Sequence, residues 1–153
     1  MTHRLLPLLL NRSHPSAIIN LSSVLGQLPC PFNPIYGATK AFNRTFSRAL
    51  TAEYAHQGLQ VLSVCPGLVQ SQLTGLGEDS WLAVGAEKTA EGALAALGVE
   101  VECYPHLWHG LTGAVAAVAG WMPEKLVTVA VAMALRFLPK PPGIKVSAGM
   151  RVR

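Results

Sequence analysis

Three stretches decide the fold: AIINL at residues 17–21, PIYGATKAFNRTFSRALTAEYAHQ at 34–57 and LQVLSVC at 59–65. The first and the last are short and mostly apolar, which is typical of strands buried on both faces of a sheet. Ser22 and Ser23 end the first run, and Pro66-Gly67 breaks the last. Strand, helix and strand in this order predict a βαβ unit whose two strands run parallel.

The middle stretch has the signals of one long helix. Asn33 is a suitable N-cap, Pro34 fits the first helical position, and Gly58 is the expected C-terminal stop. Residues at three- and four-position spacing predict one continuous apolar stripe: Ala38, Ala41, Phe42, Thr45, Phe46, Ala49 and Leu50. The helix is therefore expected to run unbroken from 34 to 57.

The remaining segments are mostly helical in pattern. Residues 86–97 predict a helix ended by Gly98, and 99–103 a short strand. The first ten residues resemble a secretory signal only superficially, because the apolar run 5–10 is short and no small-residue cleavage site follows. They predict an amphipathic helix segment. Residues 108–138 are the most hydrophobic, but Glu124-Lys125 divides them into runs shorter than the about 20 residues of a membrane-spanning helix. Helices packed on the core or lying at a membrane interface are expected there.

The composition narrows the class of protein. The chain has 153 residues, of which 50% are hydrophobic and 13% charged, and its mean hydropathy is +0.35. One domain with ample apolar surface to bury is expected, which excludes a mainly disordered chain. Three cysteines without paired spacing argue against a disulfide scaffold, and no Cys/His cluster has zinc-ligand spacing, so no metal is expected. A low content of charged residues at this hydropathy leaves two possibilities: a protein with a densely buried α/β core, or a protein that contacts a membrane.

The positive charge is uneven. Lys and Arg number 12 against 8 Asp and Glu, and residues 136–153 hold five basic residues and no acid. Such a tail after an apolar segment is either solvated or bound to an anionic membrane surface. Nucleic acid is not an expected partner, because no interleaved aromatic pattern accompanies the charge.

One constellation of residues has the chemistry of proton transfer. Tyr36 and Lys40 lie four positions apart on the predicted helix and therefore share one face. A cation that close to a phenol favours the phenolate, so the tyrosine can act as a general acid or base near neutral pH. Ser23 and Gly67 follow the two strands at their C-terminal ends, where open α/β sheets bind ligands. There the Ser23 hydroxyl can hydrogen-bond a carbonyl, and Gly67 lets a flat ligand approach the backbone.

Each of these features also has a plainer interpretation. Tyr and Lys four positions apart are common on helices, Ser22-Ser23 suit a turn, and Pro66-Gly67 suits a loop. Their occurrence together, in order and on one βαβ unit, is far more specific than any of them alone.

Three motifs, NLSS at 20–23, YGATK at 36–40 and CPGLVQS at 65–71, resemble the C-terminal half of the short-chain dehydrogenase/reductase family. Residues 1–12, 26–31 and 104–106 are similar to its 17β-hydroxysteroid dehydrogenase and very-long-chain 3-oxoacyl-CoA reductase branch. The resemblance implies an α/β fold: a partial Rossmann-like, doubly wound parallel sheet that lacks its N-terminal strands, with C-terminal apolar helices. Residues 1–107 would be the C-terminal half of the family domain, and 108–153 an apolar helical extension with a basic tail.

The resemblance also implies roles for single residues. Tyr36 would donate the proton to a ketone, Lys40 would support Tyr36 and bind the nicotinamide ribose, and Ser23 would orient the carbonyl. The wall of the nicotinamide site would be Pro66, Gly67 and Val69, with Ser71 near the carboxamide where the family usually has Thr. The implied activity is NADPH-dependent reduction of a lipid-like ketone, a 3-oxoacyl-CoA or a steroid, at the endoplasmic reticulum membrane or otherwise in the cytoplasm.

One part of the family pattern has no counterpart. The chain contains no GxxxGxG or GxGxxG turn to bind a pyrophosphate, and Met1 resembles an internal methionine of a longer protein. The 17–21 strand is therefore expected to have an exposed edge and a bare face. Three functions remain open: a piece of a longer reductase that is inactive by itself, a non-catalytic remnant or interaction subunit, or, from residues 108–153 alone, a small membrane-surface protein. The helix 34–57 would pair such a subunit with another copy or with an intact homologue.

Overall fold

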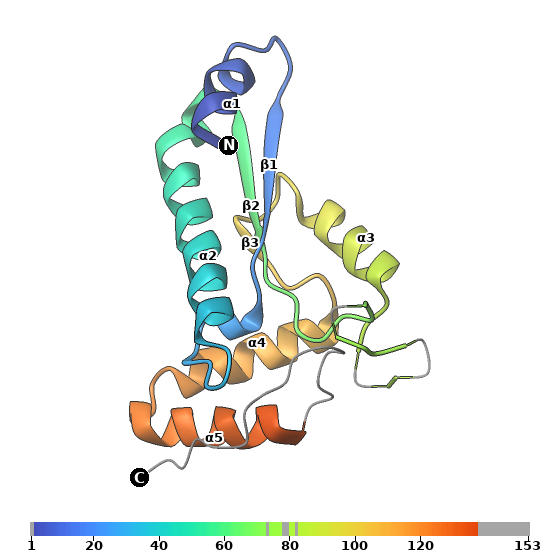
Figure 1. Ribbon diagram of the computed structural model, residues 1–153. Helices are drawn as coiled ribbons and strands as arrows, with labels where there is room; N and C mark the ends of the chain where they lie inside the picture. Colours follow the sequence, from blue (N-terminus) through green and yellow to red (C-terminus); the bar gives the residue numbers. More distant parts are fainter. Residues whose placement is uncertain (1, 73, 78–79, 82, 138–153) are drawn as a thin grey trace.

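The computed structural model describes residues 2–72, 74–77, 80–81 and 83–137. A small parallel sheet stands between helices, and two further helices lie across the end of the strands (Figure 1). The elements in chain order are α1 (Thr2–Leu10), β1 (Ser16–Leu21), the 3-10 turn η1 (Val24–Gly26), α2 (Pro34–Tyr54), the 3-10 turn η2 (Ala55–Gln57), β2 (Leu59–Val64), α3 (Ala86–Ala96), β3 (Glu102–Cys103), α4 (Leu107–Ala119) and α5 (Glu124–Phe137).

The sheet has the order β1-β2-β3, and both pairings are parallel. β1 and β2 pair along their whole length, from Ser16 opposite Leu59 to Leu21 opposite Val64. This confirms the predicted βαβ unit. β3 is shorter than the strand predicted at 99–103, because only Glu102 and Cys103 pair with β2.

The helix α2 covers one face of the sheet together with α1. Leu50 of α2 packs with Leu59 and Val61 of β2, and partly buried side chains of α1, β1 and α2 pack against them: Leu6, Leu9, Leu10, Ile18, Phe46 and Tyr54. The helix is unbroken through Phe46, as predicted, and its last turn tightens into η2 before Gly58, which has φ 78°. Asn33 is the N-cap residue and Pro34 begins the helix, as predicted, although the Asn33 side chain makes no capping hydrogen bond.

The predicted apolar stripe of α2 faces the core only in part. Leu50 is buried and Phe46 packs against the core cluster, whereas Phe42 is 64% exposed. Toward the C-terminal half of β1, α2 instead contacts the strand through polar side chains, such as Ser47, whose Oγ accepts a 2.9 Å hydrogen bond from Asn20 Nδ2.

The opposite face of the sheet is only partly covered. α3 packs Ala93 against Leu62, Val64 and Cys103, which covers β2 and β3. On β1, by contrast, Ile19 is 45% and Leu21 56% exposed. The prediction of a first strand buried on both faces was wrong for this chain, whereas the expected bare face is observed.

The two C-terminal helices, α4 and α5, lie beside each other across the C-terminal ends of the strands (Figure 1). α5 contacts the loop before α2 through a cation–π pair, in which the Arg136 guanidinium lies 5.6 Å from the centroid of the Phe32 ring. Within the described part of the chain, no helix has the length and hydropathy needed to cross a membrane. The basic tail predicted to follow lies mostly outside the described residues.

Candidate active site

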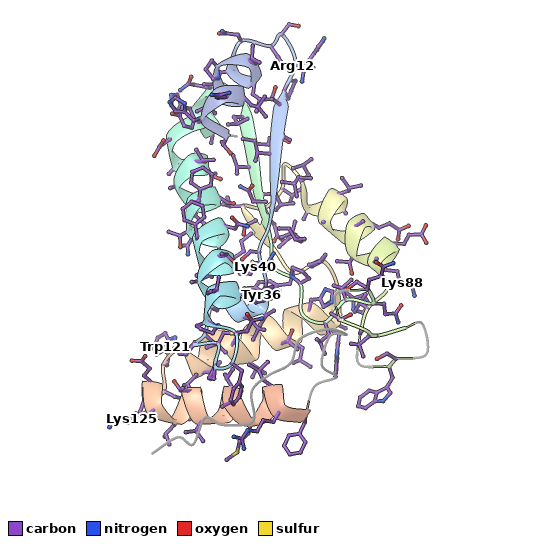
Figure 2. All side chains as sticks on the ribbon, in the orientation of Figure 1. Arg12, Tyr36, Lys40, Lys88, Trp121 and Lys125 are labelled. Atoms are coloured by element: carbon purple, nitrogen blue, oxygen red, sulfur yellow. The ribbon has the colours of Figure 1, made fainter. Side chains whose placement is uncertain are left out.

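Tyr36 and Lys40 lie together on α2, on the side that faces the end of β1 (Figure 2). The Lys40 Nζ is 5.5 Å from the centroid of the Tyr36 ring and donates a 2.9 Å hydrogen bond to the Leu21 carbonyl oxygen. Burial lowers the pKa of Lys40 from its ordinary value. A partly desolvated ammonium therefore stands next to the phenol, where its field is stronger than in water.

The two serines that follow β1 connect the end of this strand to α2 and to the loop after β2. Ser22 Oγ donates a 2.6 Å hydrogen bond to the Lys40 carbonyl oxygen of α2. Ser23 Oγ donates at 3.4 Å to the Pro66 carbonyl oxygen after β2 and accepts at 3.2 Å from the Leu25 N–H. Both serines are buried. Ser23 is therefore held in place, with its hydroxyl engaged by the backbone in this structure.

Two further residues near Lys40 were missed by sequence reasoning. Asn43 Nδ2 donates at 3.1 Å to the same Leu21 carbonyl oxygen that accepts from Lys40, and Ser22 fastens Lys40 from the strand side. The spacing of three between Lys40 and Asn43 was the available signal, because it places both side chains on the same face of the helix.

The loop after β2 contains the residues expected to form the nicotinamide wall. The Pro66 carbonyl oxygen accepts from the Val24 N–H at 3.0 Å, Val69 forms an isolated parallel bridge with Val84, and Ser71 Oγ lies 3.2 Å from Thr74 Oγ1 in an exposed turn. The structure thus brings Pro66 beside Ser23. Contacts of Val69 and Ser71 with a cofactor stay predictions.

Helix α4 packs closely on this loop. A side chain at Gly67 would meet Thr112 and His109 of α4, so the close approach that this glycine permits is that of the helix. His109 is fully buried, and its Nε2 donates to the Leu68 carbonyl oxygen at 3.2 Å. Its Nδ1 has no hydrogen-bond partner among the described residues. Burial is the main cause that lowers the pKa of His109, so the ring is neutral at physiological pH.

A polar network connects α2 with β3 and the residue after it. Arg44 makes a two-pronged ion pair with Glu102, with nitrogen–oxygen distances of 2.7 and 2.9 Å. Tyr104 donates to Glu102 at 2.9 Å and accepts from Gln27 at 2.9 Å. Burial and the hydrogen bond to Glu102 raise the pKa of Tyr104 to about 12. This network fixes the strand end and gives Tyr104 a structural rather than an acid–base function.

The buried thiols, the candidate metal ligands and an open hollow of the surface do not add a second catalytic site. Burial raises the pKa of Cys65 and raises that of Cys103 to about 11, so both thiols stay protonated and are poor nucleophiles. Across the described ranges, no group of three or more His, Cys, Asp or Glu residues is placed to hold a metal ion.

An open, mostly apolar pocket of about 510 Å³ lies between residues 28–31, the start of α2 and Thr128, but Tyr36 and Lys40 do not line it.

Comparison with known proteins assigns the family. Residues 1–79 match the family model described as short chain dehydrogenase. The chain belongs to this family. Two curated relatives of this short chain dehydrogenase are the very-long-chain 3-oxoacyl-CoA reductases of Mus musculus, 34% identical over 128 residues, and of Bos taurus, 35% identical over 127 residues. The matches cover 83% and 82% of this chain but 41% and 40% of those proteins.

Solved structures confirm the partial Rossmann-like fold. A 7beta-hydroxysteroid dehydrogenase matches with a TM-score of 0.69 at 23% identity, over 85% of this chain and 51% of that one. A short chain dehydrogenase from Burkholderia cenocepacia, solved in complex with NADP, matches with a TM-score of 0.67 at 23% identity, over 86% of this chain and 52% of that one. The chain therefore spans about half of these structures and less than half of the curated relatives.

Proposed function

We propose that the chain carries the proton-transfer half of an NADPH-dependent reductase that converts a lipid-like ketone, a 3-oxoacyl-CoA or a steroid, to an alcohol. The observation that supports this most directly is the position of the Lys40 ammonium, 5.5 Å from the Tyr36 ring and anchored on the Leu21 carbonyl oxygen. The substrate class follows from the relatives named very-long-chain 3-oxoacyl-CoA reductase.

Each residue has a defined task in this proposal. Tyr36 transfers its hydroxyl proton to the ketone oxygen, and Lys40 stabilises the negative charge that remains on Tyr36. Ser23 exchanges one of its backbone hydrogen bonds for one to the substrate carbonyl and so orients it. A bound NADPH supplies the hydride to the carbonyl carbon. On this chain, Tyr36 and Lys40 with Pro66, Gly67, Val69 and Ser71 are suited to hold only its nicotinamide end, because the sequence has no Gly-rich turn for the pyrophosphate.

The proposal is tested by adding the part of a relative that this sequence does not match. We would join the N-terminal part of the Mus musculus relative, which this chain does not match, to residues 1–153 and follow the loss of NADPH absorbance with a 3-oxoacyl-CoA or a steroid ketone. Tyr36→Phe should lower kcat by about 10²–10⁴-fold, the usual contribution of a general acid. Tyr54→Phe, on the same helix and packed in the core cluster, is the matched control. Equal rates for the two variants would refute Tyr36 as proton donor.

A second candidate function is that of a non-catalytic remnant or interaction subunit, which pairs with a second copy or an intact homologue through α2 and the following turn, residues 34–57. The supporting observation is the exposed Phe42 ring on α2, which stacks on Phe46 with ring centroids 5.4 Å apart. Phe42→Glu should abolish the pairing in sedimentation velocity without unfolding the chain, because Phe42 lies outside the core. The location at the endoplasmic reticulum membrane is likewise proposed from the relatives.

A further inference from the structure

Helix α4 buries a large polar side chain at a position where a helix normally buries an apolar one. Its buried residues are His109, Gly113 and Ala116. His109 is fully buried, yet its Nδ1 has no hydrogen-bond partner among the described residues. An unpaired nitrogen in the interior costs free energy that a leucine of similar size would not cost. A departure of this kind from the packing rules is expected where a side chain serves a functional site.

The second ring nitrogen of His109 shows what this side chain does. Its Nε2 lies 3.2 Å from the Leu68 carbonyl oxygen. A carbonyl oxygen only accepts, so the proton of the neutral ring is on Nε2. The same Leu68 oxygen also accepts from the Val84 N–H at 3.0 Å. His109 is therefore a hydrogen-bond donor from α4 to the loop that follows β2.

This loop is held from two elements at once. A Cβ added to Gly67 would lie 3.3 Å from His109 Cδ2, which is closer than an ordinary van der Waals contact, so α4 approaches the loop as far as a glycine permits. From the side of η1, the Val24 N–H donates a 3.0 Å hydrogen bond to the Pro66 carbonyl oxygen. Residues 66–68, which we call the wall segment, are therefore fixed between η1 and α4.

Helix α4 is itself fixed, as it must be if it holds the wall segment in place. It lies across the C-terminal ends of the strands (Figure 1), and the Tyr104 ring packs so closely on Gly113 that a Cβ there would collide with the ring. Tyr104 donates a 2.9 Å hydrogen bond to Glu102 of β3 and accepts one of 2.9 Å from Gln27. The position of His109 is thus set by the end of the sheet.

We propose that His109 is a positioning residue of the reductase: its hydrogen bond to Leu68 sets the wall segment and thereby the place of the nicotinamide. This rests on the proposed function, which assigns the wall segment to the nicotinamide end of NADPH. His109 itself touches neither substrate nor cofactor. The Pro66 carbonyl oxygen also accepts from Ser23 Oγ at 3.4 Å, so a displaced wall segment would shift the ketone-orienting hydroxyl as well. Small misplacements of this kind are costly to catalysis.

The first experiment measures hydrogen exchange of single amides by NMR in the full 153-residue chain. His109→Leu keeps an apolar side chain of similar size but removes the donor. The amides of Val24 and Val84, which donate to the wall segment, should then exchange about two- to tenfold faster relative to that of Ser63, which is bonded outside the wall segment. His109→Gln, whose amide nitrogen reaches the place of Nε2, should restore the slow exchange.

Two further variants keep this experiment decisive. His109→Asn places its amide nitrogen near Nδ1 and not near Nε2, so it should resemble His109→Leu and serves where the leucine does not fold. Val127→Ala, at a buried position of the neighbouring α5, destabilises the C-terminal helices without removing a hydrogen bond of the loop, and it should leave the exchange ratios unchanged. Equal acceleration of all three amides, or unchanged ratios in both donor-free variants, would overturn the proposal.

The second experiment separates this proposal from the proposed function. In the hybrid with the N-terminal part of the Mus musculus relative, His109→Leu should raise the KM for NADPH by about two- to tenfold, and His109→Gln should restore it. Destabilisation alone would lower the amount of active enzyme and leave KM unchanged. A slow Tyr36→Phe variant beside an unaltered KM in His109→Leu would refute the positioning role and keep the function. A Tyr36→Phe variant as fast as its parent would refute the function, and the exchange ratios would still decide whether His109 holds the wall segment.

Discussion

The two faces of the sheet differ in how far this chain completes them. On one face, α1 and α2 cover both β1 and β2, and the hydrogen bonds of Ser22, Lys40 and Asn43 fasten α2 to the end of β1. On the other face, α3 covers β2 and β3 and leaves Ile19 and Leu21 exposed. The candidate catalytic residues belong to the completed face. Their geometry is therefore held by local contacts, whereas the open edge of β1 is where an open parallel sheet would continue.

The largest expected effect is the difference in stability cost between truncating a leucine on β2 and truncating one on β1. Leu62 is fully buried between β2 and α3, so Leu62→Ala should lower the free energy of unfolding by about 2–5 kcal/mol. Leu21→Ala removes the same atoms from the bare face and should change it by no more than about 0.5 kcal/mol. Chemical denaturation followed by circular dichroism compares the two variants. A similar cost for both would show that β1 is covered in solution.

A second prediction concerns the contact of α3 with the chain after β3. Gly92 lies within α3, where helix propensity alone predicts that Ala stabilises by about 1 kcal/mol. A Cβ at this position, however, would collide with the backbone carbonyl of Pro105. We therefore expect Gly92→Ala to cost about 1–3 kcal/mol in the free energy of unfolding. Gly77→Ala, which meets nothing within 4 Å, is the control. A stabilised Gly92→Ala variant would mean that α3 is free to move away.

A third prediction sharpens the role of the polar network at the strand end. Glu102→Gln keeps the shape of the side chain but leaves the Arg44 guanidinium without its counter-charge. Arg44 and Glu102 side chains are 26% and 18% exposed, so solvent screens the pair and the cost should be about 1–3 kcal/mol rather than that of a fully buried pair. Thermal unfolding measures it. An unchanged melting temperature would show that the ion pair orients these side chains without stabilising the fold.

The smallest effect is a dependence on pH from His109. Burial lowers its pKa in the folded chain, so below about pH 6.5 the unfolded chain binds the proton more readily than the folded one. The free energy of unfolding should therefore rise between about pH 5 and 7, as pH rises through this window. His109→Gln should flatten the rise, and denaturation curves at each pH measure both slopes. An unchanged slope would assign the effect to other groups.

The sequence predicted the βαβ unit, the parallel pairing and the neighbourhood of Tyr36 and Lys40, because strand, helix and residue spacing are local properties. It predicted only part of the face of α2 that meets the sheet. Leu50 and Phe46 of the apolar stripe pack on the core, but Phe42 is exposed, and the contact with the end of β1 is made by Asn43 and Ser47. The packing of His109 on Gly67 and the Arg44–Glu102 pair also escaped notice, because they join residues more than forty positions apart.

The most direct test of the account is a calorimetric titration of NADPH into the purified 153-residue chain. Tyr36, Lys40 and the 66–71 loop are suited to the nicotinamide end, but no Gly-rich turn is present to bind the pyrophosphate. Orientation of a bound hydride donor can contribute about 7–11 kcal/mol to catalysis, so a chain that does not hold the cofactor should not reduce ketones. The account predicts no measurable binding. A dissociation constant in the low micromolar range would contradict it.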